Sequence, residues 1–147
     1  QRQMCIRDRY AYLIATKIVP IEKGIPIDKS QELIRPERIR VEKELLKLEL
    51  RFGGRAFAYV GKCLYCHGAE CARKCNRPCL HPDKVRPSLE AFGFDIARTL
   101  SELFGIKLLW GKNGILPEYL VLVSGFFHNS TKNIISHTNR NQNSVNL

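Results

Sequence analysis

The residue type whose spacing says most about chemistry in this chain of 147 residues is cysteine. Five of the six cysteines fall within seventeen positions, and the first two form a Cys-x2-Cys pair. The five are Cys63, Cys66, Cys71, Cys75 and Cys79. Thiolates cross-link with each other or bind soft metals, so three interpretations compete: disulfides, a structural zinc and an iron–sulfur cluster.

Disulfides and zinc each fit the pattern incompletely. Disulfides persist in oxidising compartments, and the sequence shows no export signal. A zinc ribbon needs two cysteine pairs separated by a longer arm. Here the second pair would be Cys71 with Cys75, or Cys75 with Cys79, which follows the first pair too closely for a ribbon. A compact zinc site of four thiolates remains an alternative.

An iron–sulfur cluster fits the spacing and the local charge better. A 4Fe-4S cluster takes one thiolate at each iron, which suits cysteines that arrive from a wrapping loop. Residues 62–86 carry six Lys or Arg and two Asp or Glu, a net charge of +4 out of +10 for the chain. A cluster held by four thiolates is an anion, so this positive charge would offset it. The residues therefore favour 4Fe-4S over zinc.

Two stretches carry a specific family resemblance. The first is Gly61-Lys62-Cys63-Leu64-Tyr65-Cys66, and the second is Cys79-Leu80-His81-Pro82-Asp83-Lys84-Val85-Arg86-Pro87-Ser88-Leu89-Glu90-Ala91-Phe92-Gly93-Phe94-Asp95-Ile96. They resemble the domain of unknown function 2284 family, described as predicted metal-binding proteins of archaea and bacteria, and the resemblance spans residues 10–123. It implies a prokaryotic protein with an iron–sulfur site on Cys63, Cys66, Cys71 and Cys79, and it leaves Cys75 as a fifth candidate.

Other motif residues have more ordinary expected roles. His81 is expected to fix the loop by hydrogen bonding, with a place just outside the metal ligands as the alternative. Arg86 and Glu90 are four residues apart, which predicts an ion pair along one helical turn. The family commonly has an upstream Cys-Pro-Pro segment that this sequence lacks, so a truncated N-terminus is expected.

Both ends of the chain are expected to lie outside the domain. Residues 1–9 look like a translated adapter sequence and are expected to be a non-native leader, which sets Cys5 aside. Residues 128–147 contain six Asn and no apolar period, which predicts a disordered tail. Residues 10–127 would then form a single cysteine-rich domain.

The elements that position the cysteine segment follow from the apolar pattern. Residues 10–19 are apolar on both alternating faces, which predicts a strand covered on both sides. A helix is expected from Pro36 to Phe52, because Val41, Leu45, Leu48 and Phe52 recur at helical spacing. Leu46 and Leu50 would widen this stripe, and the pair at 53–54, Gly-Gly, would end it.

The second half predicts further short elements. Residues 56–60 read as a strand, and Asp95 is expected to cap a helix over 96–104. Strands are expected at 106–110 and 118–123, around a turn that contains Asn113 and Gly114. This order predicts an α+β fold: a small mixed or antiparallel sheet with two main helices and a cysteine-rich metal-binding loop.

These features predict a cytoplasmic protein with an electron-transfer or redox-support role. Its basic rim would dock an acidic redox protein partner. The alternative is a structural zinc module whose basic rim binds nucleic acid or an acidic protein. No apolar stretch is long enough to span a bilayer, so no membrane partner is expected. Nothing in the sequence marks a substrate pocket, and whether the chain is an enzyme is left open.

Overall fold

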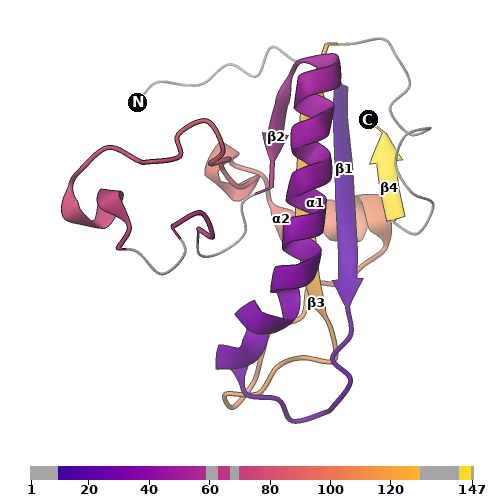
Figure 1. Ribbon diagram of the computed structural model, residues 1–147. Coiled ribbons are helices and arrows are strands. Elements are labelled where there is room, and N and C mark those ends of the chain that lie inside the picture. The colour runs from indigo at the N-terminus through magenta and orange to yellow at the C-terminus, as the bar shows by residue number, and fades with distance from the viewer. Residues whose placement is uncertain (1–9, 59–62, 67–69, 130–142, 147) are drawn as a thin grey trace.

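The sheet at the centre of the computed structural model is antiparallel throughout, and one long helix lies on one of its faces (Figure 1). The structure describes residues 10–58, 63–66, 70–129 and 143–146. The predicted α+β class is confirmed, with an antiparallel rather than a mixed sheet. The leader predicted at residues 1–9 lies outside the described residues.

Four strands form the sheet in the order β2-β3-β1-β4. Their bounds are β1 Tyr10–Ile18, β2 Arg55–Phe57, β3 Leu120–His128 and β4 Asn143–Asn146. β1 and β3 pair along their whole length, from Tyr10 opposite His128 to Ile18 opposite Leu120. β2 and β4 are therefore the two edges of the sheet.

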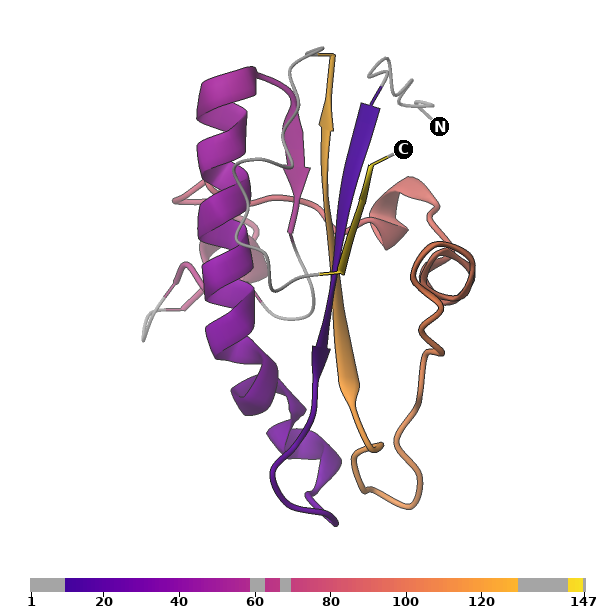
Figure 2. The ribbon, with the colours of Figure 1, turned by 90° about the vertical axis from the view of Figure 1, so that its right-hand side faces the viewer.

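The sheet has a separate apolar core on each face, as the two-sided pattern of β1 predicts. Tyr12 and Ile14 point to one face, where Val41, Leu45 and Leu48 of the long helix cover them. The residues between them, Leu13 and Ala15, point to the other face and pack in a second cluster with Phe57, Leu89, Leu100, Val123 and Phe127. Figure 2 shows the sheet edge-on between these two layers.

The long helix α1 spans Ser30–Phe52 and begins six residues before the predicted start at Pro36. It follows directly on a 3-10 turn at Ile27–Lys29, and Ile34 already packs inward, so burial extends the helix through the proline. The helix ends as predicted: Gly53 has a φ of 67°, and its N–H donates to the Glu49 carbonyl over 3.0 Å. One expectation is wrong, because Leu50 is 90% exposed.

On the opposite face, the second helix begins where Asp95 predicts. α2 spans Ile96–Thr99, and the Asp95 carboxylate accepts the Arg98 N–H over 3.0 Å. The chain then continues as a π-helical turn at Leu100–Phe104 and stops at Gly105. The sequence therefore locates this helical segment correctly but does not predict its change from α-helix to π-helix.

The hairpin predicted at 106–123 is only partly present. Asn113 and Gly114 form the predicted turn, with positive φ angles of 53° and 74°, and Lys112 exchanges two backbone hydrogen bonds with Ile115. Residues 106–110 do not form a strand, because Ile106 and Leu108 pack down onto the second apolar cluster. β3 extends past the predicted end at residue 123, since β1 offers it a partner as far as His128.

Two other boundaries differ from expectation. β2 stops at Phe57, and residues 59 and 60 of the predicted 56–60 strand lie outside the described residues. Part of the predicted disordered tail belongs to the sheet: His128 ends β3, and β4 pairs with β1. An edge strand is held by backbone hydrogen bonds to its neighbour. A search for apolar side chains therefore does not detect it. Residues 130–142 and 147 of that tail are outside the described part.

No helix in the described ranges combines the length and the apolar character needed to cross a bilayer.

Candidate metal centre

The cysteine segment follows β2, an edge strand of the sheet, and loops out to one side of β2 and α1 before it returns to the body of the protein (Figure 1). Its five cysteines are all free thiols. Cys63, Cys66, Cys71 and Cys79 are partly buried, whereas Cys75 is exposed. The four partly buried thiols are those that the family resemblance implies as ligands.

These four thiols also influence one another. The pKa of Cys66 lies above its ordinary value because of burial, and then because of Cys71, which contacts it by charge and by a hydrogen bond. The charges of Cys63 and Cys79 raise the same pKa further. Cys66 is therefore hydrogen-bonded to Cys71 and lies within electrostatic range of Cys63 and Cys79.

Cys71 has the opposite environment. The nearby backbone N–H groups of Arg73 and Lys74 lower its pKa, and the charge of Lys74 acts in the same direction. The Lys74 N–H itself donates to the Cys71 carbonyl over 2.9 Å. Both residues belong to a 3-10 turn at Ala72–Cys75, which begins just after Cys71. This turn therefore presents N–H groups to a thiolate, the form in which cysteine binds metal.

The sulfur of Cys79 accepts a backbone hydrogen bond. The backbone N–H of His81 lies 3.4 Å from the Cys79 sulfur. The His81 ring packs against Tyr65, with 6.2 Å between the ring centroids, and Tyr65 precedes Cys66. His81 thus joins the Cys79 turn to the Cys-x2-Cys pair through its backbone N–H and a ring contact, and the hydrogen-bonding role predicted for its side chain stays a prediction.

The sulfurs are neighbours, but they do not converge on a single ion. Within residues 10–58, 63–66, 70–129 and 143–146, no three or more His, Cys, Asp or Glu side chains form a group that could hold one metal ion. The donor types suit a thiolate-bound metal group: four partly buried thiols on one loop, with backbone N–H groups that lower the pKa of Cys71 and one that donates to the Cys79 sulfur. The choice of these four as ligands stays a prediction.

α1 forms the wall behind the Cys-x2-Cys pair. A cleft of about 270 Å³ lies between them, lined by Cys63, Cys66, Arg35 and Arg38 among others. The Arg38 side chain is only 2% exposed. Two guanidinium groups on this wall make the cleft favourable for negative charge, including that of thiolates.

Tyr65 attaches the Cys-x2-Cys pair to the helix. Burial raises the pKa of its phenol well above the ordinary value, and a hydrogen bond to the Glu42 carboxylate adds to the effect. Glu42 is 6% exposed and lies on α1, one residue beyond the buried Val41. A bond from a buried carboxylate holds Tyr65, and with it the neighbouring Cys66, against the helix.

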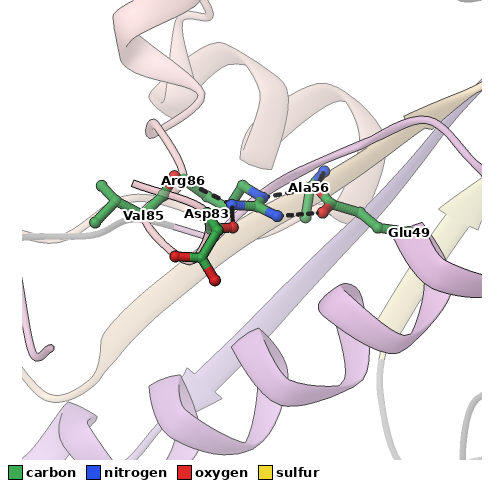
Figure 3. A network of polar contacts seen from close by, with 5 residues as sticks. All are labelled: Glu49, Ala56, Asp83, Val85 and Arg86. Atoms are coloured by element: carbon green, nitrogen blue, oxygen red, sulfur yellow. Dashed lines mark hydrogen bonds and ion pairs between the residues drawn. The ribbon is translucent and has the colours of Figure 1, made fainter. Parts of the chain in front are cut away.

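Arg86 attaches the other end of the cysteine segment to the same helix (Figure 3). Its Nε and Nη2 donate to the two carboxylate oxygens of Glu49 over 2.8 and 2.5 Å, and its Nη1 donates to the Asp83 and Val85 carbonyls. Glu49 also accepts the Ala56 N–H of β2 over 2.5 Å. This pairing corrects the predicted Arg86–Glu90 ion pair, which does not form because Glu90 begins a separate 3-10 turn.

Three residues after Arg86, the chain is already anchored on the opposite face of the sheet. Leu89 is 1% exposed and packs in the second apolar cluster, while Arg86 bonds to α1 on the first face. The motif Arg-Pro-Ser-Leu therefore passes around the β2 edge and fixes the cysteine segment from both sides. Its role is to position the loop, and it places no ligand of its own.

The sequence reading missed the two carboxylates on α1 that hold this loop. Glu42 and Glu49 are seven residues apart, two turns of helix, and each follows a buried residue of the apolar stripe. The signal in the sequence that could have identified them is the repeat of acidic residues directly beside the buried apolar stripe. Their partners, Tyr65 and Arg86, are distant in the sequence, and only the fold brings them together.

A comparison with protein families agrees with this site. The model of a family described as predicted metal-binding protein (DUF2284) matches residues 3–123. No curated protein and no solved structure matches the chain. The family match covers most of the chain, including the whole cysteine segment, and confirms the resemblance drawn from its motifs. The chain belongs to this family of predicted metal-binding proteins.

Proposed function

We propose that Cys63, Cys66, Cys71 and Cys79 hold a 4Fe-4S cluster and that the protein carries electrons to or from a partner protein. The observation that supports this most is that these four cysteines are partly buried free thiols on one loop, and the pKa of Cys66 responds to each of the other three. Cys75 is exposed at the surface and is left out of the ligand set.

The charge around the loop supports a cluster rather than a zinc ion. A cluster with four thiolates carries net negative charge, which is stable only beside compensating positive groups or N–H donors. Here Arg35 and Arg38 line the cleft behind Cys63 and Cys66, and N–H groups face Cys71 and Cys79. Four thiolates around one zinc ion also leave net negative charge. A single zinc ion, however, needs the four sulfurs closer together than a 4Fe-4S cluster does.

The chain's own residues have defined parts in this proposal. When bound, the cluster supplies a one-electron redox couple. The N–H groups near Cys71 and Cys79 stabilise thiolate sulfur, and Tyr65 and Arg86 keep the two ends of the loop on α1. Hydrogen bonds and charges of this kind set the reduction potential of a cluster.

The setting and the partner are part of the same proposal. Free thiols that bind metal are typical of a reducing compartment, so we place the protein in the cytoplasm. Residues 62–86 carry a net charge of +4, which suits an acidic redox protein that docks near the loop. Charge complementarity of this kind speeds association and selects among partners.

Metal analysis tests the proposal. Protein purified without oxygen should contain about four irons and four acid-labile sulfides per chain, as the cubane requires. A colourless protein with one zinc and no sulfide would contradict it. The zinc form would then be assayed on duplex DNA and RNA, where a nucleic-acid role requires an affinity that falls steeply with salt.

A further inference from the structure

The face of α1 beside the Cys-x2-Cys pair exposes a row of large apolar side chains. Leu50 is 90% exposed and Ile39 is 46% exposed, and Leu46 lies between them on the same side of the helix. With Leu64 from the cysteine segment they line a groove of about 340 Å³. The sequence pattern had placed Leu46 and Leu50 in the core, so this exposure is a feature that the fold itself creates.

Exposed leucines in a groove indicate a binding surface. Burial of a leucine side chain stabilises a folded chain, and this chain gains almost none of that stabilisation at Leu50. Single exposed apolar residues are ordinary, but several that line one hollow mark a contact with another molecule. The groove is therefore available to a partner that brings its own apolar side chains.

The groove adjoins the candidate metal centre. Leu64, which lies between Cys63 and Cys66 in the sequence, lines this groove and also the cleft that contains those two thiols. Tyr65 lines the groove as well. A molecule seated here would contact the residues that separate two of the proposed ligands, which would bring it close to the candidate metal centre.

The positive charge at the rim of the groove favours an acidic partner protein over a second copy of the chain. Lys43 and Lys47 line the groove four residues apart, and Lys47 keeps a side chain that is 58% exposed although it pairs with Glu44. The one carboxylate in the lining, that of Glu42, is only 6% exposed, so the accessible charge at the rim is positive. A second copy of the chain would bring the same two lysines and the same net charge of +10. A membrane surface offers negative charge but is too flat to fill a hollow between a helix and a loop.

We propose that this groove is the docking site of an acidic partner protein, and that it receives an amphipathic helix whose leucines face Ile39, Leu46 and Leu50. Acidic residues beside those leucines would meet Lys43 and Lys47. The inference rests on the proposed function, since it names the surface through which the electron-transfer partner would bind.

Synthetic peptides test the groove directly. Three labelled peptides of about 18 residues, five turns of helix, would be compared by fluorescence anisotropy on the metal-loaded chain. One carries a leucine stripe flanked by Glu, one the same stripe flanked by Lys, and one a scrambled Glu and Leu sequence. The first should bind at least about tenfold more tightly than the other two.

Matched variants locate the binding. Leu50→Glu and Lys43→Glu should each weaken the acidic peptide at least about tenfold, because they remove an apolar contact or reverse a rim charge. Ile21→Glu is the control, since Ile21 is fully exposed in the loop after β1 and does not line the groove. Equal binding of the scrambled peptide, or equal loss in Ile21→Glu, would overturn the proposal.

The remaining outcomes are also decisive. A dimer seen by light scattering that Leu50→Glu dissociates would make a second copy the occupant and overturn the proposal. If the chain binds phosphatidylserine vesicles but no peptide, and Leu50→Glu abolishes the vesicle binding, the occupant is a membrane and the proposal is overturned. Iron is measured in every sample. A chain without iron that still binds the acidic peptide refutes the cluster but keeps the groove, and an iron-loaded chain that does not bind refutes the groove alone.

Discussion

Cys75 and Cys79 illustrate how two cysteines of one short segment can differ in environment. Cys75 closes a 3-10 turn and is exposed, whereas Cys79 is partly buried and accepts the His81 N–H. Cys79 is also among the thiols that raise the pKa of Cys66. The spacing alone left the identity of the ligands open, and these environments distinguish the two residues.

A pair of serine variants follows from this difference. Cys75→Ser should retain the full iron and sulfide content, because its sulfur is proposed to lie outside the ligand set. Cys79→Ser should lose most of the cluster, since serine replaces a proposed thiolate ligand. Iron and sulfide are measured per chain after purification without oxygen. Equal loss in both variants would show that the proposed ligand set is wrong.

At the scale of elements, an ion pair between Arg86 and Glu49 is one of the two attachments of the cysteine segment to α1. The side chains of Arg86 and Glu49 are 16% and 15% exposed, and they bond through both carboxylate oxygens. Glu49 also bonds to the Ala56 N–H, so the same carboxylate links α1, β2 and the loop. Loss of either partner leaves a partly buried charge without its bonds.

Alanine variants of this pair should therefore be destabilised. Arg86→Ala is expected to lower the free energy of unfolding by about 2 kcal/mol, the typical cost of losing hydrogen bonds to a charged group. A double-mutant cycle with Glu49→Ala, followed by urea unfolding, measures the coupling. Arg98→Ala is the matched control: its pair with Glu102 is 71% and 57% exposed, and its loss should cost less than about 0.5 kcal/mol. Similar losses in both variants would contradict the structural role given to Arg86.

For the molecule as a whole, Glu49 makes stability depend on pH. Burial raises the pKa of Glu49, but bonds from Arg86 and Ala56 and the nearby positive charge outweigh burial and hold it below its ordinary value of about 4.5. The unfolded chain therefore takes up a proton at higher pH than the folded chain does. The stabilisation is complete above pH 4.5 and is lost as the pH falls through the lower folded value.

Urea unfolding at a series of acidic pH values tests this dependence. The free energy of unfolding should fall less steeply below pH 4.5 in Glu49→Gln than in the unmodified chain. Glu37→Gln should reduce the slope less. A hydrogen bond to Arg40 lowers the pKa of Glu37 too, but the Arg40 side chain is 44% exposed and solvent screens the pair. An unchanged slope in Glu49→Gln would refute the assignment.

Local patterns predicted most of the elements but not their partners. The stripe of Val41, Leu45 and Leu48 located α1, and Asp95 located α2, because helical signals lie within a few residues of each other. The strand predicted at 106–110 does not form, because the apolar side chains of this segment pack on the second apolar cluster. Whether an extended segment joins a sheet depends on the surface that its side chains cover.

For the candidate site, too, local patterns predicted the residues but not their distant partners. The cysteine spacing and the motif around Cys79 predicted a metal site, and the family match confirms that much. The ion pair of Arg86 was assigned to Glu90 because that residue is close in the sequence, whereas the fold supplies Glu49, 37 residues earlier. Contacts of this kind depend on how α1 packs, which no local pattern encodes.

The pairing of β1 with β3 also constrains the order of events during synthesis. β1 ends at residue 18, but both strands that flank it lie beyond residue 119. The central ladder cannot close until nearly all of the matched sequence has been translated, and such non-local pairing is slow. Because the thiols emerge well before this closure, a nascent chain displays them without their framework. The metal site proposed above would therefore be complete only after β3 has paired with β1.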